Sequence, residues 1–391
     1  MKLAIKLAFR NLIGAGLRTW LNVIVLSFAF VVILWLKGIM TGWDLQAKND
    51  MTDYEIGGGQ YWHENYDPFD PFTLYESHAV VPDEFKEEIE RGDMEPILIV
   101  QGSIFPRGRM QSVNIRGINP EQTIFKLPSG KLDTITDAIP AFIGAMMAQS
   151  TRLERGDRAT IRWRDAGGTF DAAEIIITDI FYSNVPSVEA GQVYIPLHRL
   201  RDMMGLQEHA TLFTFSESET KRPEVNGWIL KTKTDLTRQV DEMLATKTAG
   251  QSVLYGILIL LAMLAIFDTQ VLSIFRRQKE IGTYIALGYT RREVVGLFTV
   301  EGTMHAFLAF ATALVYGLPF LLWQARAGWT IPMDASQFGM AMAQTLYPVF
   351  TAGLVLSTIL LLTLTTAVVS WIPARKIAKM NPTEALRGKL Q

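Results

Sequence analysis

The sequence predicts a membrane α-helical fold of four transmembrane helices, with both termini in the cytoplasm and an α+β extracytoplasmic domain inserted between helices 1 and 2. Two patterns predict it: four long apolar stretches, with about 210 residues between the first and second, and an opposite charge balance in the two parts. Of the 391 residues, 49% are hydrophobic and 19% charged. This composition is too apolar for a disordered chain and too charged for one that lies wholly in lipid.

A bilayer is crossed by about 20 mostly apolar residues. Four stretches meet this length, near Thr19–Met40, Ser252–Ile274, Val294–Trp323 and Pro348–Trp371. They divide the chain into residues 1–43 with the first span, residues 44–250 as the inserted domain, and residues 251–391 with three further spans.

Charge sets the expected orientation. Residues 44–250 hold 21 Lys and Arg against 33 Asp and Glu, a net charge of −12, whereas the rest of the chain carries +10. The basic residues flank the spans in three clusters: before the first, between the second and third, and after the fourth. Short loops rich in Lys and Arg stay in the cytoplasm, so we expect both termini inside and the acidic domain outside.

The first span is interpreted as an uncleaved anchor. Its apolar run of about 18 residues is longer than the 7–15 residues of a signal peptide, and no small-x-small cleavage site follows. Before it, Lys2, Lys6 and Arg10 recur every four positions. This stripe indicates an amphipathic helix on the inner leaflet; the alternative is a basic flank that only fixes orientation.

The inserted domain mixes strands and helices. A helix is expected to open at Pro82–Glu84, and Ala138–Arg152 also looks helical. The acidic, aromatic segment Asp44–Phe72 could be a sugar-binding or calcium loop, but it lacks EF-hand spacing, and we expect an irregular solvated connection. Strands are expected at Ile97–Val100, Ser112–Arg116, Thr160–Trp163, Glu174–Thr178 and Gln192–Ile195.

Several chemistries are excluded. The chain has no cysteine, which removes disulfides, thiolate zinc sites and a cysteine nucleophile. It also lacks a P-loop, an H-E-x-x-H pair and a G-x-S-x-G elbow, and its five histidines are scattered. We therefore expect no enzyme activity, no resident metal or cofactor, and no ATP hydrolysis by this chain itself.

Two carboxylates fall inside spans. Asp268 in the second span and Glu301 in the third each lie about 12 Å along the helix from a cytoplasmic basic cluster. Acids inside membranes are costly and suggest a function such as a proton relay. The alternative is structural, with each acid paired to a neighbouring Arg, Thr or His near the inner headgroups.

The segment Arg276–Arg292 is the most specific motif. It contains a basic cluster, then Glu280-Ile281-Gly282, then Leu287-Gly288 and a basic pair. The C-terminus adds Pro373-Ala374-Arg375 and Asn381-Pro382-Thr383-Glu384-Ala385-Leu386-Arg387. With the order of one span, outer domain and three spans, these motifs resemble the ABC transporter permeases typified by the macrolide exporter MacB, the lipoprotein-releasing Lol permeases and the division protein FtsX (type VII ABC systems, which work by mechanotransmission).

The outer domain is similar to the periplasmic domains of that family. The segments Val113–Glu121, Leu153–Asp157 and Val193–Leu197 match family segments in the same order. Asp268 is a departure, since asparagine is frequent there, whereas Glu301 falls where the family often has glutamate. The resemblance implies that residues 251–391 form an FtsX-like permease domain.

The resemblance also implies a coupling helix. The coupling residues would be Arg276, Arg277, Glu280, Ile281, Gly282, Leu287, Gly288 and Arg291. A short amphipathic helix can fit a groove on an ATPase, with Ile281, Ile285 and Leu287 in apolar contact. Gly282 and Gly288 would permit close approach and a helix end. The alternative is a solvated loop whose charges only set topology.

The implied function is that of a permease subunit in the bacterial inner membrane, with its large domain in the periplasm. Its partners would be two copies of a P-loop ATPase that bind ATP and Mg, a second permease chain (identical or different), membrane lipid, and an adaptor or lipoprotein, but no nucleic acid. The R-G-I-N-P-E region favours lipoprotein release. Efflux of peptides or macrolides, FtsX-like signalling to a periplasmic hydrolase, and an intramembrane enzyme using Asp268 and Glu301 are the alternatives.

Overall fold

A computed structural model describes residues 17–216, 222–330 and 345–379. The basic stripe before residue 17 and the motif Asn381–Arg387 lie outside these residues. The described chain forms two compact units. The membrane unit contains residues 17–43, 244–330 and 345–379, and the outer unit contains residues 44–216 and 222–243.

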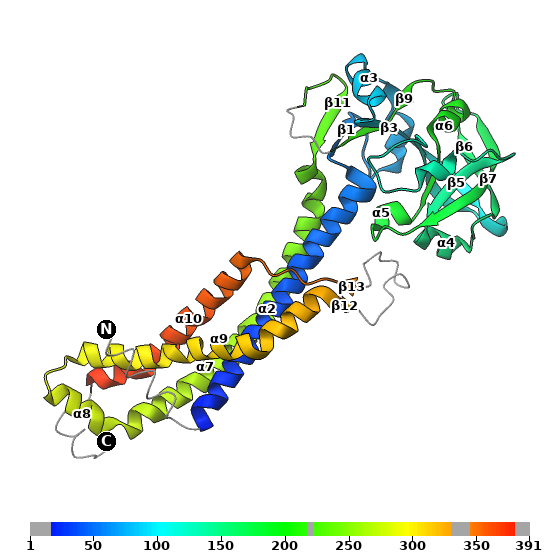
Figure 1. The fold of residues 1–391 in the computed structure, drawn as a ribbon. Helices are drawn as coiled ribbons and strands as arrows, with labels where there is room; N and C mark the ends of the chain where they lie inside the picture. Colours follow the sequence, from blue (N-terminus) through cyan, green and yellow to red (C-terminus); the bar gives the residue numbers. More distant parts are fainter. Residues whose placement is uncertain (1–16, 217–221, 331–344, 380–391) are drawn as a thin grey trace. The chain divides into compact units, whose positions relative to one another are not determined.

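Four long helices build the membrane unit: α2 (Leu17–Met51), α7 (Lys233–Arg276), α9 (Arg291–Ala327) and α10 (Ala352–Ala374) (Figure 1). Between them lie the short helices α8 (Gln278–Ala286) and η6 (Arg375–Lys379) and the strands β12 (Trp329–Thr330) and β13 (Thr345–Leu346). In the described part of the chain, four helices are long and apolar enough to cross a membrane, as predicted. The last helix starts later than expected, because the Thr351 hydroxyl caps it by accepting the Leu354 N–H.

Helix α2 is the most enclosed of the four. Its apolar side chains pack with those of α7, α9 and α10, and the Phe30 and Phe310 rings lie 5.0 Å apart. Gly38 and Gly42 of α2 permit a close approach of the chain. The Val349 N–H donates to the Gly38 carbonyl over 2.9 Å, and a Cβ on Gly42 would clash with the Tyr347 carbonyl. The chain that leads into α10 therefore lies directly on α2.

A closed mixed barrel is the centre of the outer unit. Its six strands run in the order β3 (Met94–Phe105), β4 (Gln111–Ile118), β8 (Gln192–Pro196), β5 (Ile139–Gly144), β7 (Phe170–Phe181) and β6 (Arg158–Arg164). The end of β3 pairs with β6 and closes the barrel. Gly102 lies at this closure, where a Cβ would meet Ile115 and the Arg162 carbonyl.

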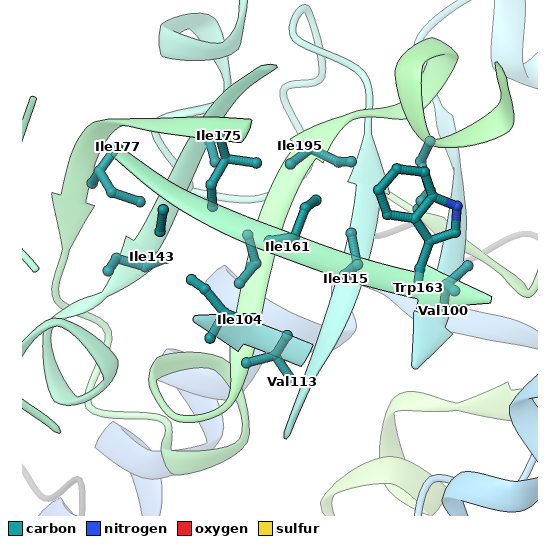
Figure 2. Packing of buried hydrophobic residues seen from close by; sticks show 14 of the residues in the cluster. Val100, Ile104, Val113, Ile115, Ile143, Ile161, Trp163, Ile175, Ile177 and Ile195 are labelled. Atoms are coloured by element: carbon teal, nitrogen blue, oxygen red, sulfur yellow. The ribbon is translucent and has the colours of Figure 1, made fainter. Parts of the chain in front are cut away.

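The barrel encloses an apolar core. Apolar side chains from all six strands point into one interior, including Val100, Ile115, Ile161 and Ile195 (Figure 2). Side chains point alternately inward and outward along a strand. The residues of β6 are accordingly exposed and buried in strict alternation. All five predicted strands fall inside observed ones, so this part of the prediction is confirmed.

Further elements surround the barrel. The strands β10 (Leu212–Phe215), β1 (Gly59–His63) and β11 (Trp228–Thr232) extend the sheet from the first half of β3. The remaining elements are η1 (Thr52–Ile56), η2 (Pro71–Tyr75), β2 (Ala79–Val80), α3 (Asp83–Glu90), η3 (Pro106–Gly108), η4 (Ser129–Leu132), α4 (Ala145–Thr151), α5 (Pro186–Glu189), α6 (Leu197–Met204) and β9 (His209–Ala210).

Two expectations were wrong. Ala138–Arg152 is not one helix, since Ile139–Gly144 forms barrel strand β5 and only Ala145–Thr151 is helical. A short apolar run cannot be assigned to helix or strand by periodicity, and here both faces of the run are buried. Asp44–Phe72 is not an irregular connection throughout, because it continues α2 to Met51, forms the π-helix η1, and enters the sheet as β1.

Candidate coupling site

The predicted coupling residues form a helical hairpin between the second and third spans. Helix α7 ends at Arg276, α8 follows at Gln278, and α9 begins at Arg291. Helix α8 ends in a Schellman motif, in which the Gly288 and Tyr289 N–H groups donate to the carbonyls of Ile285 and Tyr284. Gly288 has φ +96°, a conformation that favours glycine. The expectation that Gly288 ends a helix is therefore confirmed.

The next helix is capped just as firmly. The Thr290 hydroxyl accepts the Glu293 N–H, and the Glu293 carboxylate accepts the Thr290 N–H over 2.8 Å. This reciprocal capping box satisfies two backbone donors at the start of α9. The loop between α8 and α9 is thus fixed at both ends, so it can present its side chains in one geometry.

One face of α8 is buried against its own chain. Ile281 is fully buried, Gly282 is buried, and Ile285 packs on the edge of the same cluster. The cluster joins α8 to α9 and to the end of α10, through Ile274, Val294, Val295, Phe298, Ala374 and Ile377. The interpretation of Ile281 as an apolar contact for a partner was therefore wrong: its side chain docks α8 onto the membrane unit.

Charge pairing adds to this docking. The Arg277 guanidinium contacts both carboxylate oxygens of Glu301, at 2.7 and 2.9 Å, and the Glu280 carboxylate at 2.7 Å. It also lies 5.0 Å from the centre of the Phe298 ring. Arg277 and Glu301 side chains are only 18% and 11% exposed. The Glu301 carboxylate is thus paired with an arginine from the hairpin, the pairing that the structural interpretation expects.

The opposite side of the hairpin is exposed. Leu287 is 72% exposed and Tyr289 46%, and both are large apolar side chains. The cationic residues Arg276, Lys279 and Arg291 of the same hairpin are also exposed. A hairpin that exposes a leucine, a tyrosine and several cations can bind an acidic, partly apolar groove. Tyr289 was not among the predicted coupling residues, because it belongs neither to the Leu287-Gly288 pair nor to the basic pair that follows.

Asp268 differs from Glu301. It lies on an exposed side of α7 and makes no hydrogen bond or ion pair with any residue that the structure describes. The expectation that Asp268 pairs with a neighbouring Arg, Thr or His is therefore not met among these residues. No group of three or more His, Asp or Glu that could hold a metal ion occurs in the described ranges.

At the far end of α2, polar contacts tie the π-helix η1 to loops of the outer unit. The Lys126 ammonium contacts the Asp53 carboxylate at 2.7 Å, and the Lys126 backbone N–H donates to the Asp53 carbonyl. The Ser187 hydroxyl donates to the Glu55 carboxylate over 2.8 Å. Close by, Lys48 of α2 binds Asp241 of α7 at 2.5 Å. These contacts, which the sequence did not reveal, hold the ends of both long helices within the outer unit.

The outer unit also carries an open pocket of about 300 Å³ beside η2. Phe72 and Tyr75 line it together with Arg164, whose guanidinium lies 5.3 Å from the centre of the Tyr75 ring. Phe69 and Phe72 are 74% and 86% exposed. Aromatic faces next to a cation form a surface suited to amphiphilic molecules.

These features define a multi-pass membrane protein. A short helix between its second and third spans packs against α9 and the end of α10. Residues 252–382 match the family model of the FtsX-like permease C-terminal domain. The chain therefore carries an FtsX-like permease C-terminal domain, which is typical of ABC transporter permeases of the MacB, LolC and FtsX type. No curated protein matches the chain.

Proposed function

We propose that this chain is the permease subunit of an ABC transporter and couples ATP hydrolysis by a separate ATPase to movement of its outer domain. The exposed surface of Leu287, Tyr289 and the adjoining cations on a docked hairpin carries this proposal. The family match over residues 252–382 supports it. ATP and Mg would be bound by two copies of the partner ATPase, and this chain would have no catalytic role.

The orientation follows from charge. The hairpin that contains Arg276, Lys279 and Arg291 is one of the basic clusters that the positive-inside rule keeps in the cytoplasm. Placing it there puts both termini on the cytoplasmic side of the bacterial inner membrane and residues 44–243 in the periplasm. The coupling surface is then on the side where ATP is available.

The docking of α8 supports a mechanical role. Closure of the ATPases would push on the hairpin, and the Arg277–Glu301 pair and the apolar cluster around Ile281 would pass that force to α9. Helices α2 and α7 each run from the membrane unit into the outer unit. Their ends are held there by Lys48–Asp241 and by the η1 contacts, which supports movement of the outer domain with these helices.

The cargo would be an amphiphile already in the periplasm or outer leaflet. The pocket beside η2, with Phe72, Tyr75 and Arg164, supports an amphiphilic cargo. Lipoproteins and amphiphilic peptides or drugs both fit this description, so release and efflux remain the two cargo classes. Material that co-purifies with the complex separates them, as acylated protein or as a small amphiphile.

Replacing Leu287 by Glu tests the coupling surface. Leu287 is 72% exposed, so Leu287→Glu should leave the fold intact while it places a charge in the apolar contact. We expect co-purification of the ATPase and stimulation of its activity in reconstituted vesicles to fall about tenfold. The matched control is Ile135→Glu, which changes a fully exposed apolar residue in the outer unit. Equal stimulation in both variants would refute the coupling role.

A further inference from the structure

Two kinds of side chain line the pocket beside η2. Its apolar and aromatic surface includes Phe72, Leu74, Tyr75 and Met204. Its polar part includes Arg164 and His78. The described residues around the pocket include no carboxylate, although residues 44–250 carry 33 Asp and Glu against 21 Lys and Arg. The pocket therefore differs in charge from the acidic domain that contains it.

Two arginines on the outward face of β6 differ in their partners. The Arg158 guanidinium contacts the carboxylates of Asp137 and Glu174, at 2.8 and 2.6 Å. Arg164 is on the same face, six residues further along the strand. It makes no ion pair with any residue that the structure describes, and its guanidinium lies over the Tyr75 ring instead. One arginine of this face is thus neutralised, and the one at the pocket is not.

The Arg164 guanidinium is held in place by the turn that follows β6. Its Nε–H donates to the Gly168 carbonyl over 3.0 Å. The Asp165 carboxylate accepts a backbone N–H of the same turn over 2.7 Å, and the Tyr75 hydroxyl donates to the Ala166 carbonyl over 3.0 Å. The terminal N–H groups of Arg164 have no acceptor among the described residues. A fixed guanidinium with unused donors is arranged in advance for an oxyanion, which lowers the cost of ordering it on binding.

His78 supplies a second polar group at the pocket. It follows η2 in the chain, and its Nδ1 atom is buried without a hydrogen bond of normal geometry to any described residue. Buried polar atoms are normally hydrogen-bonded. When Nδ1 carries the imidazole proton, an oxygen atom of a bound molecule would satisfy it. Both polar groups at the pocket can therefore donate to the same kind of ligand atom.

We propose that the pocket beside η2 binds an amphiphile with one terminal oxyanion, a carboxylate or phosphate that pairs with Arg164 while the apolar part lies on Phe72 and Met204. A guanidinium binds either oxyanion through paired N–H groups. The volume of about 300 Å³ is at the lower end for ligand pockets, so it suits a headgroup and the first part of one chain. A cationic amphiphile would meet Arg164 with no carboxylate beside it. This inference rests on the proposed function and narrows its cargo to anionic amphiphiles.

Photolabelling tests the site in the full chain, reconstituted in nanodiscs of zwitterionic lipid. The probe is dodecanoate with a diazirine on its chain, and labelled peptides are identified by mass spectrometry. We expect labelling of Pro71–Tyr75 and of Met204. Dodecanoate or dodecyl phosphate in excess should compete, which identifies the headgroup, whereas dodecyl maltoside and dodecyltrimethylammonium at the same concentration should not. No labelling of these segments, or equal competition by all four compounds, would overturn the proposal.

Paired variants test Arg164 itself. Arg164→Gln should lower the labelling about tenfold, and Phe72→Ala, at a position that is 86% exposed, should also weaken it. The matched control is Arg158→Gln, which removes the same charge from the same face of β6 and should retain the labelling. Equal loss in both arginine variants would contradict the inference. Labelling needs no ATPase, so its absence would refute the site and leave the proposed coupling intact, whereas intact labelling without ATPase stimulation would do the reverse.

Discussion

Burial raises the pKa of the Glu95 carboxyl to about 7, because β3 places it inside the outer unit with only 5% exposure. The Asn119 backbone and side-chain N–H groups donate to it over 2.7 and 3.1 Å, which partly opposes this effect. Glu95 thus keeps its proton in the folded protein at a pH where the unfolded chain has lost it.

Stability of the outer unit should therefore fall as the pH rises from about 4.5 to about 7. The contribution of Glu95 is fully present below the unfolded pKa of about 4.5 and is lost as the pH rises through the folded pKa, about 3 kcal/mol in all. Hydrogen exchange of the β3 amides, corrected for intrinsic rates, measures it. Glu95→Gln should flatten the profile and be at least as stable at pH 8. An unchanged slope in that variant would show that another group is responsible.

At the scale of elements, α8 is docked onto α9 by an ion pair and an apolar cluster. Arg277 belongs to the turn before α8, and Glu301 lies 24 residues later on α9, so their ion pair joins two elements. Because both side chains are mostly buried, removing one partner leaves an uncompensated charge.

Arg277→Ala and Glu301→Ala should each lower the free energy of unfolding by about 3 kcal/mol, and the double variant should lose much less than the sum. Thermal unfolding of the purified chain in detergent gives all three values. Strictly additive losses would mean that the two side chains do not stabilise each other. Lys279→Ala, an exposed change on α8, is the control and should alter stability by less than about 0.5 kcal/mol.

Element prediction from the sequence succeeded where one physical signal dominates. The spans follow from apolar length and the barrel strands from alternation, as in Thr160–Trp163 of β6. It failed at Ile139–Gly144, where both faces are buried and alternation disappears. Strands β1, β10 and β11 were missed because their partners are distant along the chain, as Tyr61 with Phe213 shows.

For the candidate coupling hairpin, the sequence shows which residues are apolar but not the direction in which each side chain faces. Ile281 and Leu287 are both apolar and six residues apart, and an apolar side chain can face its own bundle or a partner equally well. Only the fold shows that Ile281 is buried and Leu287 exposed. The same holds for the acids: nothing near Glu301 or Asp268 in the sequence distinguishes the paired carboxylate from the unpaired one.

At the scale of the whole molecule, charge and hydropathy separate two parts of the chain. Residues 44–250 carry −12, and the remainder, with its basic hairpin and termini, carries +10. This charge asymmetry is consistent with the proposed permease, which would receive force from an ATPase on one side of a membrane and move its outer domain on the other. Every step of the proposed coupling depends on that placement.

Labelling of single cysteines with a membrane-impermeant maleimide in intact spheroplasts tests this placement most directly. Ile135→Cys reports on the outer unit and Leu287→Cys on the coupling hairpin, and both side chains are highly exposed. The account predicts that Ile135→Cys is labelled in intact spheroplasts and Leu287→Cys only after lysis. Labelling of Leu287→Cys in intact spheroplasts, with Ile135→Cys protected until lysis, would contradict it.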